Sequence, residues 1–251
     1  MSGHSKWSSI KHKKGAADKK RGQLFSKLSR ALIVAAREGG GDPSANLALQ
    51  NAIEKAKSYS MPKDNIERAI ARGSGADADA NAYETVVYEG YGAGGVAILV
   101  EALTDNRNRT ASDVRSAFSK HDGNLGASGG VAWQFDRRGI VLVDAEGADE
   151  DELMLAAAEG GADDVELDGS TFQITAAPES LSAVREAVEA AGFTVENAEL
   201  TMVPKTTVEV AEESTAKKIL RLIDALEEND DVQDVFSNFD IPERVLETVA
   251  G

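Results

Sequence analysis

The sequence of 251 residues has no cysteine and only three histidines. A disulfide framework, a thiolate metal site and a cysteine nucleophile are therefore excluded. His4, His12 and His121 do not follow the spacing of metal ligands, so we expect no metal site. The longest apolar runs, 31–36 and 153–158, span six residues, far short of the roughly 20 that cross a bilayer. We expect a cytoplasmic protein without a membrane anchor.

Signatures of common catalytic sites are also missing. The sequence has no HExxH and no P-loop. The letters GASGG at 126–130 match GxSxG, but they lie between a predicted helix and a predicted strand, whereas a nucleophile elbow leads from a strand into a helix. The glycine-rich stretch at 90–95 leads into a predicted strand, so no helix N-terminus would face a phosphate there. We therefore expect no enzymatic activity and no cofactor.

Charge is divided unevenly along the chain, whose formal net charge is -16. Residues 1–72 carry fifteen Lys or Arg and six acids, whereas residues 73–251 carry twelve Lys or Arg and thirty-seven acids. Residues 139–184 hold twelve acids and no basic residue. This division predicts a polyanionic partner for the first part and a solvated or protein-contacting surface for the rest.

The first 78 residues are predicted to form a bundle of three short helices. In the first helix one face is apolar and the neighbouring face is positive. The apolar residues are Leu24, Phe25, Leu28, Leu32, Ala35 and Ala36. Three glycines at 39–41 end this helix, a second follows over about 47–56, and a third begins after Met61 and Pro62.

After residue 82 the pattern changes to alternating strands and helices. Strands at 85–88 and 96–103 are predicted to form a hairpin, followed by a helix from Thr110 to Lys120 and a strand at 131–135. From Arg138 the order is βαββαβ, which is typical of a ferredoxin-like unit. Its aliphatic strands lack the stacking aromatics of an RNA-recognition motif.

The C-terminal helix at 215–228 and strand at 232–236 are left over by this assignment. They either complete the earlier α+β unit or form an independent appendage. The predicted fold class is α+β multidomain, in which an N-terminal helical bundle precedes two α+β domains and the ferredoxin-like one is inserted in the other. The predicted domains are residues 1–78, residues 79–136 together with 204–251, and the inserted acidic residues 137–203.

Two basic segments are candidates for nucleic-acid binding. In residues 5–14 lysines surround Trp7, which either stacks on a base or packs on the bundle. Arg107 and Arg109 precede the predicted helix, where they form an anion site or pair with nearby acids such as Asp105. The predicted binding residues are Lys6, Trp7, Lys11, His12, Lys13, Lys14, Lys19, Lys20, Arg21, Lys27, Arg30, Arg107 and Arg109.

The glycine-rich stretch GNLGASGGV, residues 123–131, has two interpretations. The first is a turn that needs a positive φ before a strand, and the second is an exposed backbone surface with a function.

Four ordered blocks resemble the YebC/PmpR family over essentially the whole chain. They are GHSKWSSIKHKKGAADKKRGQLFSKLSR, MPKDNIERAI, YEGYGAGGVAILVEALTDNRNRT and GNLGASGGVAWQF. The resemblance implies three domains, with the ferredoxin-like one inserted in the other α+β domain. Bacterial members are commonly described as DNA-binding transcriptional regulators, and a mitochondrial relative is a translational activator of cytochrome c oxidase subunit I. The chain departs from the family pattern at Asp122 and Gly130.

The sequence and the resemblance leave three hypotheses about function. The leading one is a DNA-binding transcriptional regulator that uses the basic N-terminal arm and helix. The alternative is a ribosome-associated translation factor that binds ribosomal RNA or tRNA. The resemblance implies that such a factor assists the synthesis of proline-rich sequences, to which some bacterial members are linked. A membrane-surface protein is disfavoured, because the apolar face of the first helix is better used in a core.

Overall fold

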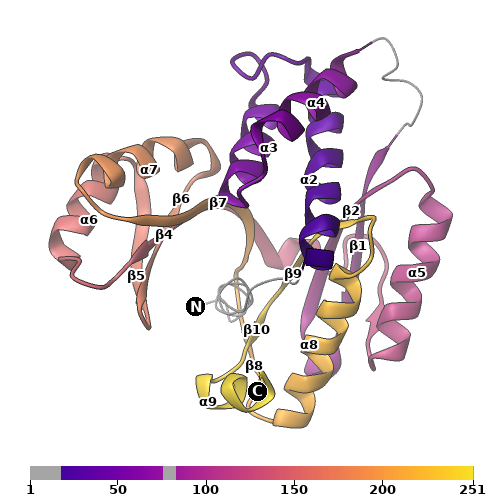
Figure 1. Cartoon of the computed structure of the whole chain (residues 1–251). Coiled ribbons are helices and arrows are strands. Elements are labelled where there is room, and N and C mark those ends of the chain that lie inside the picture. The colour runs from indigo at the N-terminus through magenta and orange to yellow at the C-terminus, as the bar shows by residue number, and fades with distance from the viewer. Residues whose placement is uncertain (1–17, 76–82, 251) are drawn as a thin grey trace. The chain divides into compact units, whose positions relative to one another are not determined.

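The computed structural model describes residues 18–75 and 83–250 (Figure 1). The chain divides into two compact units. The first unit comprises Met1–Phe135 and Pro204–Gly251, and the second unit comprises Asp136–Val203. None of the described helices is both long and apolar enough to cross a membrane.

The described part of the first unit begins with three helices, α2 (Asp18–Gly39), α3 (Leu47–Ser58) and α4 (Lys63–Ser74). Their apolar faces meet in a core where Leu32 and Leu49 are fully buried. A positive φ of 87° at Gly40 follows α2, as expected for a helix C-terminus. Asn46 caps α3, because its side-chain oxygen accepts a hydrogen bond from the Leu49 amide at 3.1 Å. The predicted N-terminal helices are confirmed.

The same unit contains a four-stranded sheet in the order β3-β1-β2-β9. Its strands are β1 (Glu84–Tyr91), β2 (Ala97–Thr104), β3 (Asn124–Leu125) and β9 (Val232–Ser237). β1 and β2 form the predicted antiparallel hairpin, and β9 pairs antiparallel with β2 across more than a hundred residues of sequence. The C-terminal strand is therefore part of this sheet.

Helices α5 (Arg107–Lys120) and α8 (Glu213–Glu227) cover one face of the sheet (Figure 1). Phe118 from α5 and Leu222 from α8 are fully buried in the core that they share with Val100 of β2. Short strands β8 (Val208–Glu209) and β10 (Phe239–Asp240) pair parallel to each other, and α9 (Glu243–Ala250) adds Val245 and Leu246 to this core. Helix α9 has no counterpart among the helices predicted from the sequence.

The opposite face of the sheet contacts the helical part. Because side chains alternate along a strand, Asp234 of β9 lies on the face opposite to the buried Val235. Asp234 Oδ1 is 2.6 Å from the ammonium of Lys55 on α3. The guanidinium of Arg37 on α2 donates to the Tyr83 carbonyl oxygen at 2.7 Å, just before β1. Polar contacts thus join the helices to the sheet.

The second unit holds a separate sheet in the order β5-β6-β4-β7. Its elements are β4 (Phe135–Asp144), α6 (Glu150–Glu159), β5 (Ala162–Asp168), β6 (Thr171–Ala176), α7 (Leu181–Ala190) and β7 (Val195–Pro204). Val141, Leu153, Ile174 and Val184 form the centre of its core, between the two helices and one face of the sheet. Exposed acids populate the unit, as its composition requires.

Two element boundaries differ from the sequence-based prediction. Helix α5 begins at Arg107, three residues before Thr110, because the Asn106 side chain accepts from the Arg109 amide and acts as the cap. The strand predicted at 131–135 is wrong, since Ala132–Gln134 form a 3-10 turn and β4 begins at Phe135. Backbone amides at 131 and 132 bond a buried carboxylate instead of a neighbouring strand.

Substitution at Gly73 tests the close contact between α4 and α2. A Cβ at Gly73 would lie 2.3 Å from the Ile33 carbonyl oxygen, so Gly73→Ala forces the helices apart. We expect Gly73→Ala to lower the free energy of unfolding by about 1–3 kcal/mol, measured by urea unfolding followed by circular dichroism. Gly22→Ala is the matched control. Gly22 is an exposed residue of α2, and its added Cβ would meet no neighbouring side chain within 4 Å. Gly22→Ala should stabilise by up to about 1 kcal/mol, and equal effects of the two substitutions would contradict this packing.

Candidate nucleic-acid interface

The structure describes only some of the predicted binding residues. Lys6, Trp7, Lys11, His12, Lys13 and Lys14 lie outside the described residues. Lys19, Lys20 and Arg21 lie in the first turns of α2. The structure describes the side chains of four further candidates, Lys27, Arg30, Arg107 and Arg109. Three of them, Lys27, Arg30 and Arg109, have partners inside the protein, and the side chain of Arg107 extends away from the other two arginines.

Two cations of α2 contact the turn between α8 and β9. The Lys27 ammonium donates to the Glu227 carbonyl oxygen at 2.5 Å. One guanidinium nitrogen of Arg30 donates to the Asp230 carbonyl oxygen at 2.5 Å and lies 3.3 Å from Asp231 Oδ1. Burial lowers the pKa of Lys27, even though Glu227 attracts its charge. Both side chains are therefore held by partners within the first unit.

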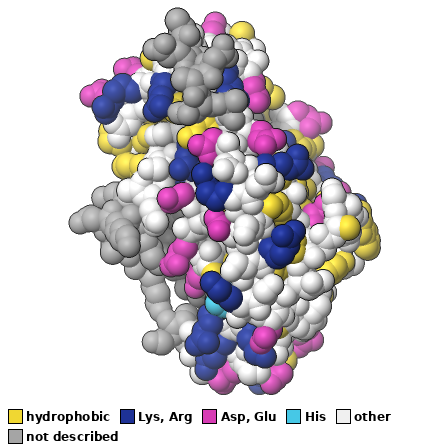
Figure 2. Space-filling view, turned by 90° about the vertical axis from the view of Figure 1, so that its right-hand side faces the viewer, with side chains coloured by type: hydrophobic (Ala, Val, Ile, Leu, Met, Phe, Trp, Pro, Cys, Tyr) yellow, Lys and Arg dark blue, Asp and Glu magenta, His cyan; other side chains and the backbone are white. Residues whose placement is uncertain are grey.

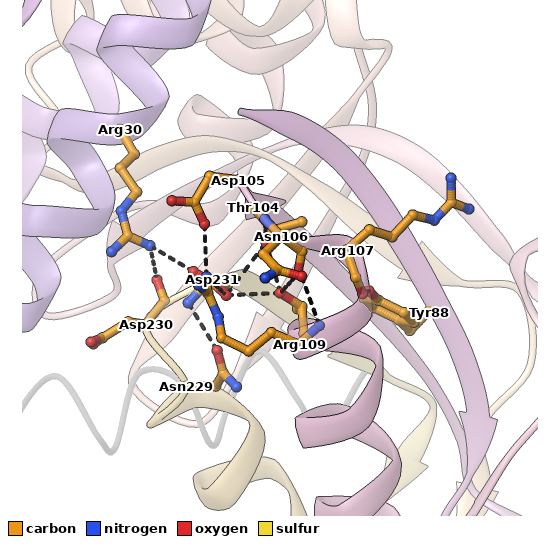
Figure 3. Close-up of polar contacts among 11 residues, drawn as sticks. Arg30, Tyr88, Thr104, Asp105, Asn106, Arg107, Arg109, Asn229, Asp230 and Asp231 are labelled. Atoms are coloured by element: carbon orange, nitrogen blue, oxygen red, sulfur yellow. Dashed lines mark hydrogen bonds and ion pairs between the residues drawn. The ribbon is translucent and has the colours of Figure 1, made fainter. Parts of the chain in front are cut away.

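Asp231 is the centre of this cluster (Figure 3). Its side chain is only 8% exposed. Asp231 Oδ2 accepts from Arg109 at 2.7 Å and from the Thr110 hydroxyl at 2.8 Å, while Arg30 approaches the other oxygen. The backbone is also fixed, because the Asp231 carbonyl oxygen accepts from the Leu103 amide of β2. This carboxylate joins α2, the first turn of α5 and the start of β9.

The charged state of Asp231 is favoured by its partners. Burial alone would raise the pKa of the carboxyl group, but the hydrogen bonds from Arg109 and Thr110 outweigh burial. The positive charges of Arg109 and Arg30 act in the same direction, and together these groups hold the pKa of Asp231 below its usual range. An ionised, largely buried carboxylate is the result.

The two arginines at the start of α5 have different surroundings. Arg109 bridges Asp231 and Asp105, which lies 2.9 Å away, so it pairs with local acids. Arg107 is exposed, and its side chain extends away from the Asp231 cluster (Figure 3). Its carbonyl oxygen accepts from the Tyr88 hydroxyl at 3.4 Å. Of these two arginines, Arg107 is the one placed to meet an external anion.

Cations on the side of the molecule that carries α5 do not form one continuous patch. Figure 2 shows the described Lys and Arg side chains of this face interspersed with Asp and Glu. Lys218, for example, lies 2.9 Å from Asp122. Among the described residues no group of three or more His, Asp or Glu side chains could hold a metal ion.

A second buried carboxylate organises the glycine-rich stretch. Glu89 of β1 is 5% exposed, and it accepts hydrogen bonds from three backbone amides. Oε1 accepts from Gly129 at 2.6 Å, and Oε2 accepts from Val131 and Ala132 at 2.7 Å each. Burial alone would raise the pKa of Glu89, but these hydrogen bonds lower it. We call residues 126–132 the Glu89 loop.

The Glu89 loop agrees with the turn interpretation of the sequence. Gly129 has a φ of 84°, which requires glycine, and the Tyr91 hydroxyl donates to the Gly130 carbonyl oxygen at 3.1 Å. Sequence reasoning did not find Asp231 or Glu89, because a carboxylate in an acid-rich chain carries no sign of burial. Alternation in β1 gave no signal either, because it places Glu89 on the same face as the exposed Val87.

Two family models match the chain. The one described as "TACO1/YebC protein N-terminal domain" matches residues 5–76, and "TACO1/YebC second and third domain" matches residues 83–239. A "probable transcriptional regulatory protein" of Rubrobacter xylanophilus is 61% identical over 251 residues, which are 100% of each chain. A protein of the same description from Natranaerobius thermophilus is 54% identical and covers 99% of this chain and 100% of its own.

A crystal structure is also similar. It is of a conserved hypothetical protein from Aquifex aeolicus and matches with a TM-score of 0.79 at 50% sequence identity. The match covers 89% of this chain and 92% of that chain. The mixed α/β architecture with N-terminal helices is therefore that of this solved structure.

Asp231→Asn tests the charge at the cluster. A carboxyl whose pKa is lowered by folding stabilises the protein above its unfolded pKa of about 3.9, and this contribution is lost as the pH falls through the folded pKa. We expect Asp231→Asn to cost roughly 3 kcal/mol at pH 7 and progressively less below about pH 4. Urea unfolding across this pH range measures both. The exposed neighbour Asp230→Asn should have little effect, and a pH-independent cost at position 231 would contradict the electrostatic explanation.

Glu89→Gln tests the loop. A carboxamide offers one acceptor oxygen, and its NH2 group cannot accept from a backbone amide, so at least one loop amide loses its partner. We expect amide hydrogen exchange at Gly129, Val131 and Ala132 to become about 10- to 100-fold faster, which corresponds to a lost hydrogen bond to a charged group. Glu84→Gln, at an exposed position of the same strand, is the control. Unchanged protection of all three amides would show that Glu89 does not hold the loop.

Proposed function

Because the chain belongs to the TACO1/YebC family, we propose that it is a cytoplasmic regulator of gene expression that binds nucleic acid through its basic N-terminal segment. Its relatives are named probable transcriptional regulatory proteins, which supports a regulatory role. We further propose that the ligand is DNA and that binding regulates transcription.

The main support for this proposal is that some cations have partners inside the protein, whereas the basic N-terminal segment has few matching acids. Lys27, Arg30 and Arg109 are already engaged inside the first unit, Lys27 by a carbonyl oxygen and the two arginines by Asp231. Residues 1–21 hold seven Lys or Arg and one acid. Phosphate binding by counterion release requires such a cluster of cations without matching acids. The proposed contacts are therefore Lys6, Lys11, Lys13, Lys14, Lys19, Lys20 and Arg21, together with Trp7, His12 and the exposed Arg107.

RNA on the ribosome is the second candidate ligand. The Lys and Arg residues of 1–21 are lysines except for Arg21, and lysine contributes mainly phosphate binding as a point charge. Sequence-specific reading of duplex DNA relies chiefly on Arg, Asn or Gln in the major groove, and Lys reads only guanine there. This composition favours a ligand recognised by charge and shape, as in a translation factor that contacts ribosomal RNA or tRNA.

The second unit is proposed to be the ferredoxin-like domain inserted in the other α+β domain. Its strand order β5-β6-β4-β7, with α6 and α7 packed in one core, supports this assignment. Its Asp and Glu side chains repel nucleic acid, so the proposed partners of this domain are proteins.

Substitution of arm lysines tests nucleic-acid binding. If about six phosphates are neutralised, the logarithm of the binding constant for duplex DNA falls with the logarithm of salt concentration with a slope of about -5. We expect the triple change Lys11→Ala, Lys13→Ala and Lys14→Ala to weaken binding and to reduce this slope by roughly 3. Fluorescence anisotropy titrations at several salt concentrations measure affinity and slope together.

The matched control removes three cations that already have acidic neighbours on their own helices. Lys63, Arg185 and Lys217 each pair with an acid at i±4. Their joint change to Ala should leave the slope unchanged. If both triple variants lose affinity equally, net charge rather than the arm governs binding, and the proposal is wrong.

A further inference from the structure

Trp133 is a large apolar side chain that the fold leaves in solvent. It lies in the 3-10 turn Ala132–Gln134, directly after the Glu89 loop, and its residue surface is 66% exposed. In the first unit the other exposed large apolar residues among those described are Leu47 on α3 and Val87 on β1. Most of the indole surface is therefore accessible to a ligand.

The indole is held in one orientation. Its Nε1–H donates to the Gly130 carbonyl oxygen at 3.1 Å, and the Tyr91 hydroxyl donates to the same oxygen at 3.1 Å. Gln134 in turn donates from Nε2 to the Tyr91 hydroxyl oxygen at 3.2 Å. Since the polar edge is bonded internally, the exposed remainder of the ring is apolar π surface. A ring fixed before binding loses little conformational freedom when a ligand packs on it.

The base beneath the ring is also fixed. Glu89 holds the preceding loop through Gly129, Val131 and Ala132. Phe135, which follows the turn, is 4% exposed and anchors its other end. Trp133 is therefore an exposed ring on a rigid support at both ends.

The surroundings of Trp133 suit a nucleic acid better than a protein. Residues 126–130 are exposed and small, with side chains no larger than those of Ala127 and Ser128. A tryptophan that dominates a protein interface is instead surrounded by other packed side chains that exclude water. The Lys205 amide donates to the Gln134 carbonyl oxygen at 2.8 Å, which ties the chain after Pro204 to the turn. An exposed aromatic face beside an open backbone is a surface on which a base of a single strand stacks.

We propose that Trp133 is a stacking site for an unpaired base of a single-stranded nucleic-acid segment. This inference rests on the proposed function and adds a second contact to it, remote in sequence from the basic arm. It also specifies the ligand, because bases within an intact duplex do not offer a free face to an indole.

The test compares three labelled ligands of equal phosphate number. They are a single strand of about 12 nucleotides, the same strand with every base removed, and a short duplex. We expect the protein to bind the single strand about 5- to 150-fold more tightly than the abasic strand. Trp133→Ala should remove this difference without changing the salt slope, and Trp133→Phe should retain part of it because a smaller aromatic face remains. Leu47→Ala, another exposed apolar side chain of the first unit, is the matched control.

The outcomes separate this inference from the proposed function. Equal binding of the base-containing and abasic strands, with no effect of Trp133→Ala, overturns the stacking site and leaves phosphate binding intact. Failure to bind any of the three ligands overturns both. If Trp133→Ala instead abolishes association with a protein while all three affinities stay unchanged, Trp133 is a protein contact and the inference is wrong.

Discussion

A buried ionised carboxylate, Asp231, joins parts of the first unit that are far apart in sequence. Its two oxygens meet Arg30 from α2 and Arg109 and Thr110 from α5, and its own strand pairs with β2. Burying a charge is unfavourable unless the charge is paired and hydrogen-bonded, so the arrangement is stable only when all of these elements are in place. The helices carrying the basic residues are thereby fixed to the sheet rather than attached by the chain alone.

The contacts of the Asp231 cluster also determine which cations are available to a ligand. Lys27, Arg30 and Arg109 donate to internal oxygens, whereas the side chain of Arg107 extends away from the Asp231 cluster (Figure 3). A second carboxylate, Glu89, acts on uncharged groups and fixes the backbone that supports Trp133. Two buried acids thus perform different tasks in an acidic chain. One neutralises arginines, and the other shapes a loop and presents an aromatic ring.

Much of the fold follows from the sequence, because local patterns determine its elements. The apolar face of α2, the hairpin of β1 and β2, and the later alternation of strands and helices are readable as periodicities. The start of α5 and the turn at 132–134 were not readable, since they depend on Asn106 as a cap and on Glu89 as an acceptor. The partners of the candidate binding residues were even less predictable from the sequence. Whether Arg109 binds an external anion or an internal acid depends on Asp231, which lies more than a hundred residues away and looks like any other acid in its run.

The proposed contacts of this chain with nucleic acid are the basic N-terminal segment and the ring of Trp133. Both are tested by ultraviolet crosslinking in living cells, with sequencing of the bound DNA and the bound RNA and identification of the crosslinked peptides. We expect crosslinks in residues 5–21 and 126–134, and the sequenced nucleic acid decides between transcription and translation. Crosslinks confined to the acidic second unit, or none above the background of a protein that does not bind nucleic acid, would contradict both proposed contacts.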